Sequence, residues 1–252
     1  MRLVRRSNPL RRRLAAVAPM PLTHIVPISY VEGPAVVGRR RKVVAGTSVA
    51  GAALLGASLS TEPGSKKFYA STGVVAGVWT LGGLASGPLH LGWIQTRDEK
   101  LRRPILTPLA TGVGAFGLFY AAALVARRIP VLDEAISRVL VFADEGDDRL
   151  VLLTTLANGL GEEIFFRGAL YAAIPGHPVA ASTAVYALST TTTRNPALVL
   201  AASVMGTLFG LQRRASGGLQ APTITHLTWS ALMLRFLPPL FRRTPPRPPE
   251  NR

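Results

Sequence analysis

Long apolar segments separated by short polar ones run from residue 43 to residue 240. Most of them approach the roughly 20 residues that a tilted helix needs to cross the hydrocarbon of a bilayer. Gly and Pro recur inside them, as they do in membrane helices. The pattern predicts an all-α integral membrane protein, a bundle of about seven to eight transmembrane helices. The predicted spans are residues 43–60, 69–87, 105–126, 150–174, 177–193, 195–212 and 218–240.

These spans divide the chain into four parts. Residues 1–42 are basic and interrupted by prolines, which predicts a cytoplasmic tail, and residues 241–252 form a second basic tail that is rich in Pro. Residues 43–149 hold accessory transmembrane helices, followed at 131–149 by an amphipathic helix that is expected to lie along the membrane interface. Residues 150–240 contain the candidate chemistry and form the predicted core domain.

The charge is separated from the apolar segments. The chain has a net charge of +16 and a pI near 11.5, yet 48% of its residues are hydrophobic and its mean hydropathy is +0.29. Because the basic residues lie in tails and loops without interleaved aromatic residues, they favour contact with anionic lipid head groups and argue against nucleic acid as a partner. The absence of cysteine excludes disulfides, thiolate metal sites and a cysteine nucleophile. The abundance of Ala, Gly, Pro and Arg is typical of a bacterial protein.

The same charges predict an orientation. The positive-inside rule places the amino terminus and the loop at 97–103 in the cytoplasm of a multi-pass cell-membrane protein. Two predicted spans lie between these regions, so the two assignments agree. Seven spans would put the basic tail after Phe241 outside, unless a further crossing or a re-entrant segment exists.

Three ionisable residues interrupt the fourth span, in the stretch GLGEEIFFRGALYAAI. A charged side chain at the centre of such a helix costs about 2.5–3.5 kcal/mol on insertion scales, so Glu162, Glu163 and Arg167 require partners or a function. Glu163 and Arg167 are four residues apart, in the favourable order for an ion pair. Glu162 points about 100° away and is predicted to stay free, as a general base would. In the last span His226 and Ser230 share one helix face.

These motifs resemble those of the CPBP family of intramembrane proteases, the CAAX proteases and bacteriocin-processing proteins. The sequence EEIFFRG matches the family's Glu-Glu-x-x-x-Arg motif, and FGLQRRASGGLQAPTITHLTWS is similar to its last block, a glycine-rich approach to His-x-x-x-Asn. The resemblance covers about residues 150–235. It implies a polar cavity inside the bundle, where a peptide bond of a membrane-embedded or membrane-associated protein or peptide is hydrolysed.

The resemblance also implies a role for each matching residue. Glu162 would activate the water, while Glu163 and Arg167 would hold the geometry of the site. His226, with Ser230 at the family's Asn position, would stabilise the tetrahedral oxyanion.

The family's middle motif, Phe-x-x-x-His, is altered in the aligned stretch STAVYALST. Tyr186 stands at the Phe position and Thr190 at the His position. Thr190 can orient a water molecule but cannot accept a proton near neutral pH. A divalent metal such as zinc would have only Glu162, Glu163 and His226 as candidate ligands, and because the two adjacent glutamates point apart, a mechanism without a cofactor is favoured.

Three functions are compatible with these residues. The first is an intramembrane endopeptidase, and the second is a catalytically impaired pseudoprotease that acts as a membrane scaffold or regulator, which the altered middle motif favours. The third is a transporter that uses the carboxylates as a proton relay, but no internal repeat supports it. The charges could also serve only to pack helices, with Glu162 bonded to a backbone group.

Overall fold

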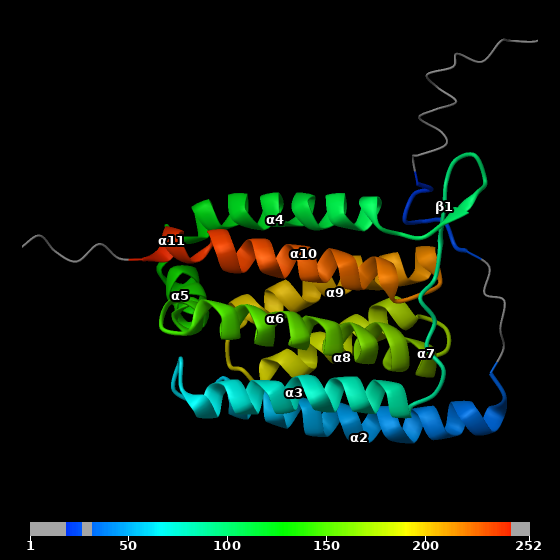
Figure 1. The fold of residues 1–252 in the computed structure, drawn as a ribbon, viewed down its shortest axis with the longest axis horizontal. Helices are drawn as coiled ribbons and strands as arrows, with labels where there is room; N and C mark the ends of the chain where they lie inside the picture. Colours follow the sequence, from blue (N-terminus) through cyan, green and yellow to red (C-terminus); the bar gives the residue numbers. More distant parts are fainter. Residues whose placement is uncertain (1–18, 27–31, 243–252) are drawn as a thin grey trace, which may run out of the picture.

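Seven long helical segments lie side by side and alternate in direction in the computed structural model, which describes residues 19–26 and 32–242 (Figure 1). A short antiparallel hairpin of β1 (Ile94–Gln95) and β2 (Leu101–Arg102) joins the second segment to the third. The short helix α11 (Pro238–Phe241) ends the described chain, at the end of the bundle opposite to β1. The predicted helical bundle is confirmed. Its long segments are α2 (Pro34–Ser58), α3 (Lys66–Ala85), α4 (Leu106–Ala126), the continuous run of α6 (Asp148–Glu162), the π-helix η1 (Glu163–Leu170) and α7 (Tyr171–Ala173), then α8 (Pro178–Thr191), α9 (Pro196–Ser216) and α10 (Gln220–Phe236).

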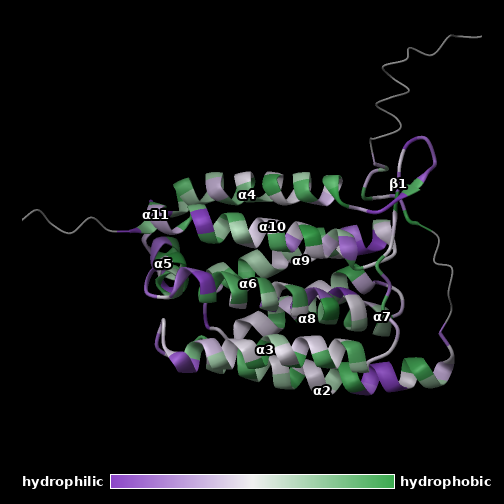
Figure 2. Ribbon diagram, viewed as in Figure 1, coloured by the Kyte–Doolittle hydropathy of each residue, from purple (hydrophilic) through white to green (hydrophobic). Residues whose placement is uncertain are grey.

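Three of the described helices are long and apolar enough to cross a membrane: Lys66–Ser86, Leu106–Ala126 and Pro196–Ser216. The others are shorter, as in α8 with 14 residues and α10 with 17, or carry charged residues, as in α2 and the α6–η1 run. Figure 2 shows apolar residues along most of the bundle and hydrophilic ones in the loop around β1. The number of seven to eight membrane crossings stays a prediction.

The outer face of α4 supports a membrane environment. Leu106 and Leu118 are 74% and 66% exposed, and several other large apolar side chains of this helix also point outward. A continuous apolar outer surface is unfavourable in water. In lipid it carries no such cost, because apolar side chains are well solvated there and the backbone groups within the helix bond to one another.

The first long helix begins earlier than predicted. α2 starts at Pro34, a residue favoured in the first helical turn, so residues 34–42 belong to a helix and not to a tail. Within it Arg40 is fully buried, ion-paired with Glu32 and bonded to the Ser86 hydroxyl at 3.0 Å. These contacts tie α2 to the end of α3. Residues 1–18 of the predicted tail lie outside the described residues, as does the carboxy-terminal tail from residue 243.

The predicted amphipathic helix is present as α5 (Pro130–Asp144), which lies across one end of the bundle (Figure 1). Its apolar face turns inward: Leu140 is buried, and Leu132, Ile136 and Val139 are partly buried. α5 therefore covers the interior between the long helices, and its predicted position at a membrane interface stays a prediction.

The side chain of Asn195 links α5 to the start of α9. Asn195 caps α9, because its Oδ1 accepts hydrogen bonds from the backbone N–H groups of Ala197 at 3.0 Å and Leu198 at 3.2 Å. Its Nδ2 donates to the carbonyl of Ala135 in α5 at 2.7 Å. Asn195 is buried, so both functions of the amide are performed out of contact with solvent.

We expect Asn195→Ala to lower the free energy of unfolding by about 1–2 kcal/mol, since it removes both the cap and a buried hydrogen bond. Asn195→Ser is the matched control, because serine caps the helix but is too short to reach Ala135. Denaturant unfolding of the purified protein should therefore place Asn195→Ser between the wild type and Asn195→Ala. Equal stability of all three proteins would contradict the link between α5 and α9.

Close helix contact occurs at only some of the Gly-x-x-x-Gly spacings that the sequence contains. A Cβ at Gly206 of α9 would lie 3.1 Å from Thr183 and 3.2 Å from Tyr186 of α8, so glycine lets these two helices approach. A Cβ at Gly73 or Gly77 of α3 would meet nothing within 4 Å, so the same spacing brings no neighbouring helix into close contact there.

Candidate active site

The two glutamates lie where the helix changes its winding. Glu162 is the last residue of α6, and Glu163 begins the π-helix η1, in which nearly every side chain is buried. Short π-helical stretches are rare and are often found at functional sites. Trp79 of α3 holds η1 in place: it is fully buried, and its ring centroid lies 4.8 Å from that of Phe165 and 4.9 Å from that of Phe166.

Glu163 is the centre of a buried charge cluster. Its Oε1 lies 3.2 Å from Nη1 of Arg167, which confirms the predicted ion pair, and 2.8 Å from Nδ1 of His226. The side chains of Glu163 and Arg167 are 0% and 1% exposed. One carboxylate oxygen therefore joins the π-helix to α10, far along the chain.

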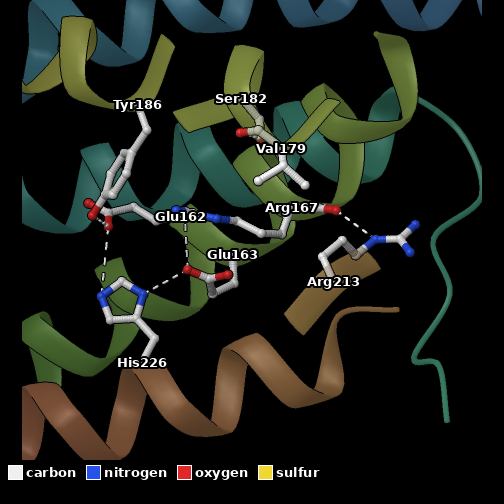
Figure 3. A network of polar contacts seen from close by, with 8 residues as sticks. All are labelled: Glu162, Glu163, Arg167, Val179, Ser182, Tyr186, Arg213 and His226. Carbon is white, nitrogen blue, oxygen red and sulfur yellow. Dashed lines mark hydrogen bonds and ion pairs between the residues drawn. The ribbon is translucent and has the colours of Figure 1, made fainter. Parts of the chain in front are cut away.

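The orientation of His226 follows from these contacts. A carboxylate paired with arginine can only accept, so Nδ1 of His226 carries the proton that Glu163 binds. Phe209 stacks against the imidazole, with ring centroids 4.6 Å apart and an interplanar angle of 23°. Nε2 of His226 then points at Glu162, with its Oε2 at a distance of 4.0 Å (Figure 3).

Glu162 has a hydrogen-bond partner that the sequence did not indicate. The hydroxyl of Tyr186 in α8 donates to its Oε2 at 2.6 Å (Figure 3). The prediction that Glu162 stays free is therefore wrong. No hydrogen bond or ion pair joins Glu162 to Glu163 or Arg167, but α8 brings in the Tyr186 hydroxyl, which the helix geometry of α6 alone could not indicate. At 13% exposure Glu162 is the more accessible of the two glutamates.

Arg167 is held more by aromatic rings than by hydrogen bonds. Its guanidinium carbon lies 4.6 Å from the ring centroid of Tyr186 and 5.1 Å from that of Phe209, within the range of cation–π attraction. Nε of Arg213 donates to the Arg167 carbonyl at 2.9 Å, which adds a contact from α9 to the π-helix. The guanidinium thus fixes Glu163 and supports the ring of Tyr186.

A cavity of about 320 Å³ reaches this cluster from the end of the bundle that α5 covers. Glu162, Tyr186 and His226 lie along it, and its remaining lining is mostly apolar, including Val139 and Leu140 of α5. Glu163 and Arg167 do not line the cavity, so they act on the site only through their contacts with His226 and Tyr186.

The other two predicted site residues also line this cavity. Ser230 lies one turn after His226 and is buried. Thr190 is buried too, but its hydroxyl donates to the backbone carbonyl of Tyr186 at 2.9 Å and so bonds within its own helix. The structure therefore brings all six predicted residues to one region, and Thr190 makes no bond to Glu162 or His226.

The residues of the site do not fit a zinc ion. Oε1 of Glu163 is already shared by the Arg167 guanidinium and Nδ1 of His226, and Oε2 of Glu162 holds the Tyr186 hydroxyl. Among the described residues no group of three or more His, Asp or Glu side chains is placed to hold a metal ion. A tetrahedral site with three protein ligands needs such a group.

Tyr186 is a residue of the candidate site that neither motif indicates. It is a departure from the family's Phe, and its hydroxyl is the one side-chain donor to Glu162 among the described residues. The available signal was the pairing of two changes one helical turn apart, in which a hydroxyl is gained at 186 and an imidazole is lost at 190.

The protein is thus a helical bundle with a buried cluster of glutamate, histidine and arginine side chains at the end of an internal cavity. Residues 149–232 match the family described as Type II CAAX prenyl endopeptidase Rce1-like. This match covers about a third of the chain, and for these residues it confirms the resemblance predicted from the two motifs. No curated protein and no solved structure gave a significant match.

Proposed function

We propose that the chain is an intramembrane endopeptidase that hydrolyses a peptide bond of a membrane-associated protein or peptide, with Glu162 activating the water. The observation that carries the proposal is the pairing of Oε2 of Glu162 with Nε2 of His226, 4.0 Å apart beside the cavity. Two atoms at that separation can both lie about 2.8 Å from a third atom, so one oxygen can contact both at hydrogen-bond distance.

The proposed chemistry uses the chain's own residues. Glu162 takes a proton from water as the oxygen bonds to the substrate carbonyl carbon, and it returns that proton to the nitrogen as the C–N bond breaks. His226, when it carries a proton on Nε2, donates to the oxyanion together with Ser230. Glu163 keeps the imidazole in one orientation, as a carboxylate does in hydrolases that pair it with histidine.

The charge distribution supports a cytoplasmic position for the end of the bundle that carries β1. That end carries the basic loop 97–103 and the start of α2, while acidic residues of α5 and the following loop lie at the other end (Figure 1). Basic residues are retained on the cytoplasmic side and contact anionic head groups there. The amino terminus would then be cytoplasmic, and the end of the cavity that α5 covers would lie at the opposite face of the membrane.

One observation favours a second function. The Thr190 hydroxyl bonds within α8, so Thr190 does not replace the missing histidine of the middle motif directly. A chain without that group could still bind membrane segments in its cavity, as a pseudoprotease that serves as a scaffold or regulator.

The test compares the termini of membrane proteins in the native host with those in a deletion strain, with and without complementation by the intact chain. We expect a set of internal termini that depends on the chain and disappears in the deletion strain. A deletion that has a phenotype but changes no terminus would refute the endopeptidase and leave the scaffold.

A further inference from the structure

The hydroxyl of Tyr186 occupies a place in the site that no matched motif assigns. It lies 2.6 Å from Oε2 of Glu162, the same oxygen that faces Nε2 of His226 at 4.0 Å. A neutral phenol can only donate to a carboxylate, so the contact fixes the direction of this oxygen and leaves its other lone pair available.

The ring of Tyr186 is fixed from three sides. The Phe166 ring lies 4.7 Å away between centroids, and the Arg167 guanidinium carbon lies 4.6 Å from the Tyr186 ring. The third side is Gly206 of α9, where a Cβ would come within 3.2 Å of the ring. Thr190 adds a hydrogen bond to the Tyr186 carbonyl. Because the ring cannot move freely, the position of its hydroxyl is set before substrate binds.

We propose that Tyr186 is a positioning residue that holds the Glu162 carboxylate with Oε2 towards His226. In this way it compensates for the histidine that is absent at position 190. The inference rests on the proposed endopeptidase function. It explains the two changes in the middle motif together, since both positions face the same cavity from α8. The phenol does not touch the substrate in this account and acts through Glu162.

The experiment measures kcat and KM for cleavage of the peptide that spans a chain-dependent terminus, with the full chain in host membranes. Tyr186→Phe removes only the hydroxyl. We expect kcat to fall about 10- to 100-fold, as for loss of a hydrogen bond to a charged group, while KM changes little. Thr191→Val is the matched control on the same helix, because Thr191 is exposed, lies outside the cavity lining, and its hydroxyl donates only to the Leu188 carbonyl of α8 at 2.6 Å, so kcat should stay near the wild-type value.

A rescue variant separates positioning from packing. Tyr186→Phe combined with Thr190→His restores the motif of the family, and position 190 lines the cavity of about 320 Å³. This double variant should recover most of the lost kcat. The proposal is overturned if Tyr186→Phe keeps wild-type kcat, if Thr191→Val loses as much as Tyr186→Phe, or if a folded double variant recovers nothing.

Glu162→Gln, measured beside these variants, distinguishes the two levels of the argument. If the wild type and Glu162→Gln cleave equally, the proposed function fails and the role of Tyr186 fails with it. If cleavage depends on Glu162 but not on the Tyr186 hydroxyl, only the role of Tyr186 fails. An independent readout is the carboxylate stretch of Glu162 in infrared difference spectra, which should shift between the wild type and Tyr186→Phe.

Discussion

Replacing Glu162 by glutamine is expected to lower the rate of cleavage by at least about 10²–10⁴-fold, the usual contribution of a positioned general base. Glutamine has nearly the same shape and can accept the Tyr186 hydrogen bond through its amide oxygen, so the local packing should survive. It cannot take a proton from water near neutral pH. The loss should therefore appear in kcat, measured on the chain-dependent terminus at matched protein abundance.

The control for this variant is Glu134→Gln, which makes the same chemical change on α5, where Glu134 is exposed. It should leave the rate unchanged. A Glu162→Gln protein that cleaves at more than half the wild-type rate would rule out Glu162 as the base. If the protein termini of the host do not depend on the chain, and the Glu162→Gln strain does not show the phenotype of the deletion strain, the result would favour the scaffold function.

The part of the site that lies within one helix could be predicted from residue spacing. The Glu163–Arg167 pair follows from a separation of four residues and was found at 3.2 Å. Only the family resemblance links His226 to the same site, because residue spacing cannot indicate a contact between two residues that are 63 positions apart in the chain. The π-helical winding at Glu163 was not predicted, since the hydrophobic period alone does not distinguish it from an α-helix.

The contact of Tyr186 with Glu162 could not be predicted from either motif. It depends on how closely α8 approaches α9, which the absence of a side chain at Gly206 allows. The position of Arg40 shows the same limit for the fold. A run of basic residues before an apolar span indicates a tail, but Glu32 and Ser86 provide partners that only the folded chain brings together.

Arg167→Met should destabilise the fold by about 3–5 kcal/mol, the usual cost of removing one partner from a buried ion pair. Methionine keeps much of the aliphatic volume but leaves the Glu163 carboxylate, 0% exposed, with only His226 as a partner. It also removes the guanidinium from the ring faces of Tyr186 and Phe209. The measurement is reversible unfolding of the purified protein in one fixed detergent.

The double variant Glu163→Gln with Arg167→Met decides whether the unpaired charge causes this loss. If it does, removing the carboxylate as well should restore part of the stability, and the two changes together should cost less than their sum. Arg167→Lys, which keeps the charge but not the planar group, should fall between Arg167→Met and the wild type. Strictly additive costs would mean that Arg167 stabilises the bundle mainly through its contacts with the aromatic rings. Glu163 would then depend on His226 alone for its place in the site.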